Sequence, residues 1–491
     1  MYHSFILVLY KNFFNNFFVC SPERKLHSVA EPLSFMNKLN INSSSKKYRT
    51  SFLVAFILFS CLISIPVFAE ESLIILYTGS VLGEVKPCGC SEEGDLGGIL
   101  RRATIIEKER SANKNILLLD AGDTFKEPTE QGKLKAKTMI EGFNKMGYDA
   151  ALLGEKDFVY GEEILNQGSF DHWVLSNVEN NNLKQEKTIK YFLKTFNNGT
   201  TIAVIGLLGQ ELLFAKGQTK VKVENPGIRL EKILRKLKAA GEANIILLLT
   251  HMDKEKAKEL FNLDDVDIVI NGHLDETELI VNPEIAGKKI MVHVRERGQY
   301  LGKISISTDQ KKIQNISNEY IPLNSKINDS QLVQSIYDKY NDETKQLFMK
   351  WLQDKKRARK RTFITEIACK MCHRYEYAIW KKSGHSHSFK SLKKSNKTFD
   401  PECLKCHTTG FKQDGGFMSE SITPKLINVQ CEACHGAGSN HMKFIMRDHK
   451  AEQKKINILY KKLTEDSCLP CHTRENSPNY KFSTYWEKIK H

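Results

Sequence analysis

The sequence has no single arm in which its basic residues are gathered, although the chain of 491 residues carries a formal net charge of +15. Its 73 Lys and Arg are scattered, which argues against a nucleic acid as a partner. The densest basic run, Lys355–Arg361, is typical of a solvated spacer. We therefore expect no nucleic acid among the partners.

Histidine and cysteine are also scarce over most of the chain. Only six of the 15 His and four of the 12 Cys occur in the first 362 residues. The others are concentrated in the remaining 129 residues. This uneven distribution indicates that the C-terminal segment binds a cofactor through these two residue types.

Four copies of Cys-x-x-Cys-His account for the eight C-terminal cysteines. Two thiols at this spacing can each form a thioether to a haem vinyl group, and the next residue offers an imidazole to the iron. A pair of zinc sites is the competing interpretation, but zinc does not require His after every second Cys. We therefore predict four covalent c-type haems, with proximal ligands His373, His407, His435 and His472. The attachment cysteines are Cys369, Cys372, Cys403, Cys406, Cys431, Cys434, Cys468 and Cys471.

The segment 363–491 leaves too little chain per haem for four separate apolar cores. We expect a mostly α-helical domain in which the macrocycles pack against one another, as electron transfer between them requires. Five further histidines are available as distal ligands, namely His385, His387, His441, His449 and His491.

The surroundings of the motifs resemble the cytochrome c554 family. The resembling stretches are Trp380-x-x-Ser383-x-His385, Cys403-x-x-Cys-His-Thr-Thr-Gly410-Phe, Cys431-Glu-x-Cys-His-Gly-x-Gly438-x-x-His441 and Tyr485–His491. The resemblance implies His385, His441 and His491 as distal ligands, with His387 as a competitor of His385 and His449 as a surface residue. Whether one haem keeps an open position is not decided by the number of histidines.

Residues 1–69 are predicted to be a leader and signal peptide. An apolar run from Ser51 follows Lys46, Lys47 and Arg49 and ends in the small-residue pattern before Ala69. Cleavage near Ala69 and covalent haem attachment both indicate a periplasmic protein. An uncleaved membrane anchor is the alternative, because the run is long enough to span a bilayer.

Residues 70–325 are predicted to be an α/β domain. Apolar runs that suit buried strands occur at Leu73–Tyr77, Asn115–Leu119, Asp149–Leu153, Thr201–Leu207, Asn244–Leu249 and Val266–Ile270. Between them, Ile99–Arg110, Lys133–Met146, Pro226–Ala240 and Lys254–Phe261 have helical spacing. Lys289–Val294, Gln299–Thr308 and Glu319–Leu323 are expected to finish the domain as antiparallel strands. A helix and a basic linker, 326–362, lead to the haem segment.

Polar residues after these strands are typical of an α/β active-site edge. They are Thr78-Gly-Ser80-Val-Leu82, Asp120-Ala-Gly-Asp123, Gly154-Glu155-Lys156, Thr250-His251 and Asn271-Gly-His273-Leu-Asp275. The series resembles the calcineurin-like metallophosphoesterases, and specifically the periplasmic 5′-nucleotidase branch, whose layered α-β-β-α fold and two-metal site it therefore implies.

The resemblance is incomplete at the metal ligands. Ser80 and Leu82 stand where the family has its opening Asp-x-His pair, and Lys156 stands where it has the catalytic imidazole. The family's remaining ligand positions fall on residues that suit one divalent ion. These candidates are Asp123, Glu155, His251, His273 and Asp275. Cys88 and Cys90, in the loop after the first strand, are either a redox or soft-metal pair or a pair of inert or disulfide-linked cysteines.

The sequence therefore predicts a periplasmic multihaem cytochrome that transfers electrons to or from a redox partner protein. Its 5′-nucleotidase-like domain is expected to bind a partner or small ligand with little hydrolytic activity. One alternative is an active metal-dependent phosphoesterase with an attached redox module. The other is a multihaem oxidoreductase acting on a small nitrogen or sulfur compound.

Overall fold

The structure is a computed structural model that describes residues 72–87, 94–126, 128–179, 182–214, 221–273, 280–355, 362–447, 463–474 and 476–491. These residues belong to one compact unit, Glu70–His491. Several predicted features lie outside the described residues, namely the leader 1–69, Cys88, Cys90, Asp275 and His449.

The first sheet is built around the strand that opens the α/β domain, β1 (Leu73–Thr78). Its seven strands run in the order β15 (Lys312–Pro322), β14 (Tyr300–Asp309), β1, β2 (Ile116–Asp120), β3 (Ala150–Ala151), β4 (Trp173–Val174) and β6 (Thr188–Ile189). From β1 to β6 neighbouring strands are parallel, whereas β14 is antiparallel to β1 and β15 is antiparallel to β14. Every residue of β1 and β2 is buried, as their continuous aliphatic sequences predict.

The second sheet has the strand order β12 (Glu284–Ala286), β13 (Lys289–His293), β11 (Ile268–Asn271), β10 (Ile245–His251), β8 (Thr201–Leu208) and β7 (Phe192–Thr195). The expected antiparallel finish is correct for β14 and β15 but only partly for β13. That strand is antiparallel to β12 and parallel to β11. Alternation of side chains gives a strand its faces but not the direction of its neighbours, which explains the error. A small sheet pairs β5 (Val178–Glu179) with β9 (Lys222–Val223).

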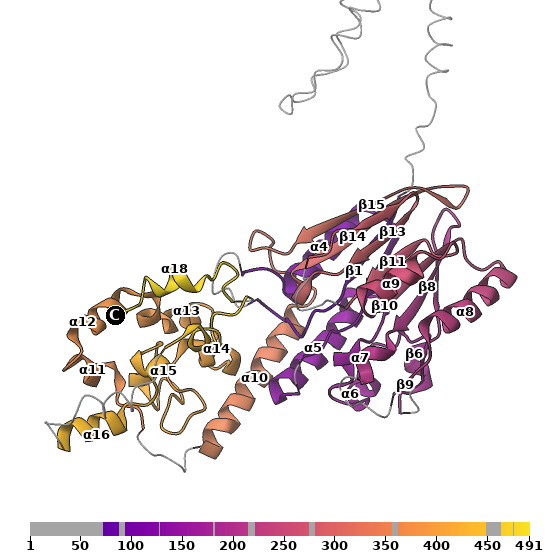
Figure 1. Cartoon of the computed structure of the whole chain (residues 1–491). Coiled ribbons are helices and arrows are strands. Elements are labelled where there is room, and N and C mark those ends of the chain that lie inside the picture. Colours follow the sequence, from indigo (N-terminus) through magenta and orange to yellow (C-terminus); the bar gives the residue numbers. More distant parts are fainter. Residues whose placement is uncertain are drawn as a thin grey trace, which may run out of the picture. The chain divides into compact units, whose positions relative to one another are not determined.

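The two sheets pack face to face and are covered by helices on their outer sides (Figure 1). On β8, Ile202 and Val204 lie in the core shared with the first sheet. The intervening Ala203 and Ile205 lie in the core shared with α8 (Pro226–Ala240) and α9 (Lys254–Phe261). Helices α4 (Ile99–Ala112) and α5 (Glu130–Met146) pack on the first sheet. The predicted layered α-β-β-α architecture is confirmed.

Local capping explains where the longer helices begin and end. Thr129 accepts a hydrogen bond from the Gly132 backbone N–H at the start of α5, and Asn225 does the same for Ile228 at the start of α8. Gly147 and Gly241 end these two helices in the left-handed conformation, which suits glycine. Two short helices, α6 (Glu163–Gln167) and α7 (Gln210–Phe214), complete the domain.

The C-terminal region is helical, as predicted. A long helix, α10 (Gln334–Lys355), precedes it. Its helices are α11 (Thr365–Lys370), α12 (Arg374–Lys382), α13 (Phe389–Lys394), α14 (Pro401–His407), α15 (Cys431–His435), α16 (Ser439–Arg447) and α18 (Phe482–Trp486). A small apolar core around Phe389, Leu404 and Phe417 also receives Phe348 and Leu352 from α10, so the predicted connecting helix is part of this core.

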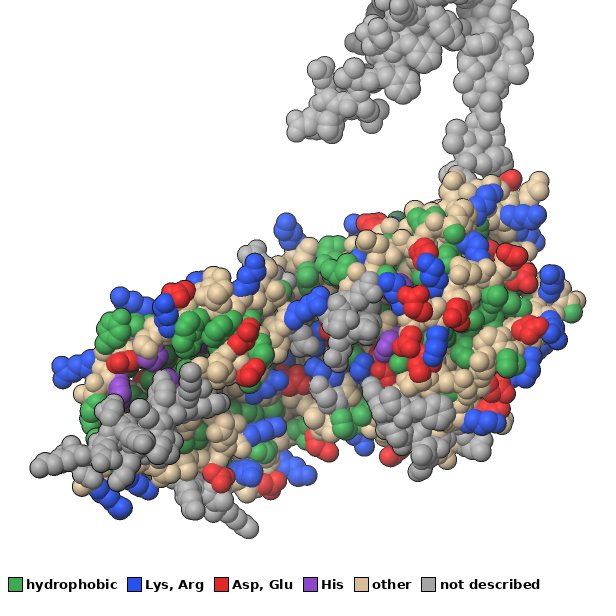
Figure 2. All heavy atoms as spheres, in the orientation of Figure 1, with side chains coloured by type: hydrophobic (Ala, Val, Ile, Leu, Met, Phe, Trp, Pro, Cys, Tyr) green, Lys and Arg blue, Asp and Glu red, His purple; other side chains and the backbone are tan. Residues whose placement is uncertain are grey.

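Among the described residues, no helix is long and apolar enough to cross a membrane. On the face drawn in Figure 2, Lys and Arg side chains alternate with Asp and Glu over the described surface. This mixed charge agrees with the scattered basic residues of the sequence.

Candidate functional site

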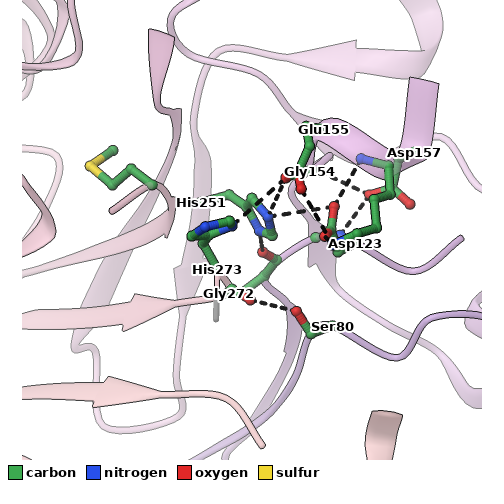
Figure 3. Close-up of polar contacts among 12 residues, drawn as sticks. Ser80, Asp123, Gly154, Glu155, Asp157, His251, Gly272 and His273 are labelled. Carbon is green, nitrogen blue, oxygen red and sulfur yellow. Dashed lines mark hydrogen bonds and ion pairs between the residues drawn. The ribbon is translucent and has the colours of Figure 1, made fainter. Parts of the chain in front are cut away.

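Four of the five candidate side chains of the α/β domain gather at the carboxyl ends of its central strands. Asp123 follows β2, and Glu155 follows β3 at the start of a short 3₁₀ helix, Glu155–Phe158. His251 ends β10, and His273 follows β11. Figure 3 shows these residues converging from both sheets, so the structure brings together the predicted ligands that lie within its described residues.

The loop that carries Asp123 is held in place by a buried carboxylate. Asp157 accepts hydrogen bonds from the backbone N–H groups of Asp123 at 2.8 Å and Phe125 at 2.9 Å. Burial, together with the nearby Asp123 charge, raises the pKa of Asp157 to about 8. Gly154 is required here, because a Cβ at that position would lie 2.3 Å from Asp123 Oδ1.

His251 is fixed in orientation by its other ring nitrogen. Its Nδ1 lies 2.9 Å from the Ala121 carbonyl oxygen, so Nε2 faces the cluster. That Nε2 lies 2.9 Å from Glu155 Oε2, and His273 Nδ1 lies 3.9 Å from the same oxygen. One ligand atom from each of these three residues lies within 4.8 Å of the others. Two imidazoles and a carboxylate at this spacing fit a divalent metal ion.

Lys156 enters the same cluster from the other side. Its Nζ lies 2.5 Å from Asp123 Oδ2 and 3.3 Å from Glu155 Oε1. Burial by itself would lower the pKa of Lys156, but the two carboxylates raise it well above its ordinary value. They likewise overcome the effect of burial at His251, whose pKa is raised. Burial and the neighbouring His251 lower the pKa of His273.

Ser80 and Leu82 occupy the place of the family's opening ligand pair. The Ser80 hydroxyl donates to the Gly272 carbonyl oxygen at 2.7 Å, so its short side chain serves the loop structure (Figure 3). The Leu82 side chain has no ligand atom, and its backbone N–H donates to the Asp123 carbonyl oxygen at 3.0 Å. Neither residue provides the charged ligand that a second metal would need.

A cavity of 3190 Å³ is lined by all four Cys-x-x-Cys-His motifs, by α10 and by residues of the α/β domain such as Lys135 and Arg297. This volume is several times the roughly 300–1,000 Å³ of an ordinary ligand pocket. No disulfide joins any of the eight motif cysteines, all of which lie within the described residues. A large cavity lined by paired thiols and imidazoles fits several covalent haem groups.

Three of the motif histidines face a second histidine across this cavity. Ring centroids lie 6.3 Å apart for His373 and His441, 6.0 Å for His472 and His385, and 5.7 Å for His435 and His491. Two metal–imidazole bonds of about 2 Å each, with half of each ring added, span a similar distance. The geometry therefore favours the same three distal histidines that the sequence favoured, and it pairs each with one motif.

The remaining motif histidine, His407 of the second motif, contacts the segment before α13. His407 Nδ1 lies 2.7 Å from the Ser388 carbonyl oxygen. That segment also carries His385, which faces His472. The competitor His387 is exposed, and its Nδ1 lies 3.3 Å from the Ser386 hydroxyl.

The motifs are arranged in two neighbouring pairs. The Cys369 and Cys431 thiols lie close enough to shift each other's pKa, and so do the Cys406 and Cys471 thiols. The first motif therefore lies beside the third, and the second lies beside the fourth.

Glu432, inside the third motif, accepts hydrogen bonds from the backbone N–H groups of Thr365 and Gly438 at 2.9 and 2.7 Å. Thr365 begins α11, the helix that carries Cys369 of the first motif.

Comparison with known proteins gives a separate result for each part of the chain. Residues 368–436 match the family model described as "Cytochrome c554 and c-prime". Over 139 residues the chain is 31% identical to cytochrome c-554 of Nitrosomonas europaea, covering 22% of this chain and 57% of that protein. The chain joins a 5′-nucleotidase-like region to a cytochrome c554-like region.

The nucleotidase-like region is similar to several curated phosphoesterases. It is 28% identical over 302 residues to the snake venom 5′-nucleotidase of Naja atra, covering 54% of this chain and 55% of that protein. It is 26% identical over 257 residues to the trifunctional nucleotide phosphoesterase protein YfkN of Bacillus subtilis, covering 43% of this chain and 17% of that protein. The chain thus spans less than two thirds of each of these three relatives.

Sequence reasoning did not foresee three contacts of the two sites. It noted Lys156 as a replacement but not as an ion-pair partner of Asp123 and Glu155. It also missed the hydrogen bonds by which Glu432 of the third motif contacts the segment before the first motif. The third contact that it missed is that of the Ser388 carbonyl oxygen with His407. Each contact joins segments or side-chain atoms whose proximity depends on the folded backbone, so no spacing rule would have found them.

Proposed function

We propose that this protein is a periplasmic electron-transfer protein with four covalent haems, carried by residues 363–491. The cytochrome c554 match suggests covalent haem c and redox partners in general. The number of haems follows from the four motifs, each of which supplies two attachment cysteines and one proximal histidine. When bound, the haems would supply reversible one-electron chemistry.

The observation that carries this proposal is the set of three histidine pairs in the cavity. His373, His435 and His472 each face a second imidazole at 5.7–6.3 Å. An imidazole on each side of the iron favours low-spin haem, which exchanges electrons without binding a substrate. Contact between the motifs in pairs also supports electron exchange between neighbouring haems.

We propose that the nucleotidase-like region, residues 70–325, binds a ligand or partner through a single divalent ion and hydrolyses phosphate esters poorly. Glu155, His251 and His273 would hold the ion, which would supply Lewis-acid chemistry. A two-metal mechanism needs a clamp on both the attacking and the leaving oxygen. Ser80 and Leu82 leave that clamp incomplete.

Haem counting and potentiometry of the purified mature protein test the redox proposal. Pyridine haemochrome spectra with intact mass should give four covalent haems per chain. A spectroelectrochemical titration should then resolve predominantly low-spin haem that is reduced and reoxidised reversibly. Two or fewer covalent haems, or a spectrum dominated by high-spin iron, would contradict the proposal.

An active phosphoesterase is the second candidate, because Asp123, Glu155, His251 and His273 still converge. It would show itself as robust 5′-nucleotide hydrolysis by the unmodified protein in the presence of manganese.

We infer the periplasmic location from the proposed signal peptide. N-terminal sequencing of the mature protein should therefore give a sequence that begins near Glu70.

A further inference from the structure

We infer that the Lys156 ammonium is a built-in second cation of the nucleotidase-like site, so that the site accepts one divalent ion where its relatives' fold would hold two. This inference rests on the single-metal site proposed above and goes beyond it by assigning the role of Lys156. It follows from the contacts of two buried carboxylates, each of which directs one oxygen toward Lys156 and the other toward His251.

Asp123 and Glu155 each turn one oxygen toward Lys156. The ammonium lies 2.5 Å from Asp123 Oδ2 and 3.3 Å from Glu155 Oε1. The Asp123 and Glu155 side chains are only 1% and 3% exposed, whereas the Lys156 side chain is 36% exposed, so the carboxylates are the buried partners of these ion pairs. A buried carboxylate requires a compensating cation, and here the chain supplies one.

The other oxygens of the same carboxylates face the imidazoles. Glu155 Oε2 lies 2.9 Å from His251 Nε2, and Asp123 Oδ1 lies 3.5 Å from it. His251 Nε2 and His273 Nδ1 are buried and lie 2.9 and 3.9 Å from the same oxygen, Glu155 Oε2. The imidazole side of the cluster therefore retains the atoms that a divalent ion would use, whereas the opposite side is occupied by the ammonium.

Charge counting supports this division. Among the described residues of the cluster, Asp123 and Glu155 contribute two negative charges and Lys156 contributes one positive charge. One divalent ion on the imidazole side then gives the cluster a small positive total, whereas two divalent ions beside the ammonium would leave a large uncompensated charge in a buried site. The missing charged ligands at Ser80 and Leu82 agree with this count.

The test measures Mn²⁺ binding to the intact haem-loaded protein by the EPR signal of free Mn²⁺. Wild-type protein should bind one Mn²⁺ per chain at this site, and His273→Ala should lose it. Lys156→Gln should bind Mn²⁺ at least about tenfold more tightly, because a like charge close to the ion is removed. Lys156→Arg, which keeps the charge, should stay within about threefold of wild type. Lys232→Gln, an exposed lysine on α8, is the matched control and should not change the affinity.

Several outcomes would overturn the inference. Two Mn²⁺ ions lost together in His273→Ala would show that the ammonium does not replace an ion. Unchanged affinity in Lys156→Gln, or equal tightening in Lys156→Arg, would remove the role of its charge while leaving the single-metal site intact. Absence of Mn²⁺ binding in every variant would remove both that site and this inference.

The wild-type stoichiometry keeps the test decisive if Lys156→Gln does not fold. Haem content and the Soret spectrum report the other region separately, so the outcome does not depend on the electron-transfer proposal.

Discussion

The C-terminal residue His491 faces His435, the imidazole of the third Cys-x-x-Cys-His motif, with ring centroids 5.7 Å apart. Its Nδ1 lies 2.9 Å from the Ile489 carbonyl oxygen, which leaves Nε2 as the nitrogen that could bind an iron. Two imidazoles that face each other at this distance can bind one haem iron from its two sides. We therefore expect His491 to be a haem ligand.

Deleting His491, or replacing it by Ala, should convert one haem from low spin to high spin. The potential of that haem should rise by on the order of 0.1 V, a fraction of the roughly 0.8 V that axial ligands span. Carbon monoxide should then bind to it. EPR and the carbon monoxide difference spectrum measure both effects, with Lys490→Gln as the control at the adjacent position. An unchanged spin state would mean that the tail is not a ligand.

His385 and His387 form a natural pair of variants, since they lie two residues apart and only His385 faces a motif histidine. His385→Ala should produce one high-spin haem, and His387→Ala should leave all spin states unchanged. Magnetic circular dichroism in the near infrared distinguishes the two results. The reverse pattern would assign the distal position to His387.

Hydrolysis of 5′-nucleotides should be weak even with added manganese, at least about 100-fold below a two-metal relative assayed in parallel. Lys156 stands in place of the imidazole that would act on the leaving group, and Leu82 has no ligand atom. The combined substitutions Ser80→Asp, Leu82→His, Glu155→Asn and Lys156→His should raise the phosphate release rate. High turnover by wild-type protein would establish an active enzyme instead.

The Lys135–Glu402 ion pair, at 2.6 Å, joins α5 to the helix that carries the second haem motif. Burial would raise the pKa of Glu402, but Lys135 lowers it below its ordinary value. The stabilisation is therefore present above the ordinary Glu pKa of about 4.3 and is lost as the pH falls through the lower folded-state value.

A double-mutant cycle with Lys135→Met and Glu402→Gln measures this contribution. Because the Glu402 side chain is 46% exposed, the coupling free energy at pH 7 should not exceed about 1 kcal/mol. Urea unfolding followed by circular dichroism should show the coupling decrease as the pH falls below the ordinary Glu pKa of about 4.3. A coupling that persists at acid pH would show that packing, and not charge, joins the two side chains.

Short-range sequence signals determined a large part of this protein. The bounds of α8 and α9 are as predicted, because capping residues and apolar spacing act within one or two turns. The predictions of haem-attachment positions and proximal histidines rest on chemistry contained in five consecutive residues. The buried strands were recognised from their aliphatic runs, since a sheet covered on both faces needs them.

The tertiary structure alone decided which distant groups meet. The resemblance favoured three of the five distal candidates, but only the folded backbone showed which motif each one faces, with His441 opposite His373 and His385 opposite His472. The same holds for Lys156, whose position in the sequence marks a lost imidazole but does not reveal an ammonium between two buried carboxylates. Spacing rules describe neighbours along one helix or strand, whereas these contacts depend on how separate elements pack, and that is fixed by the whole core.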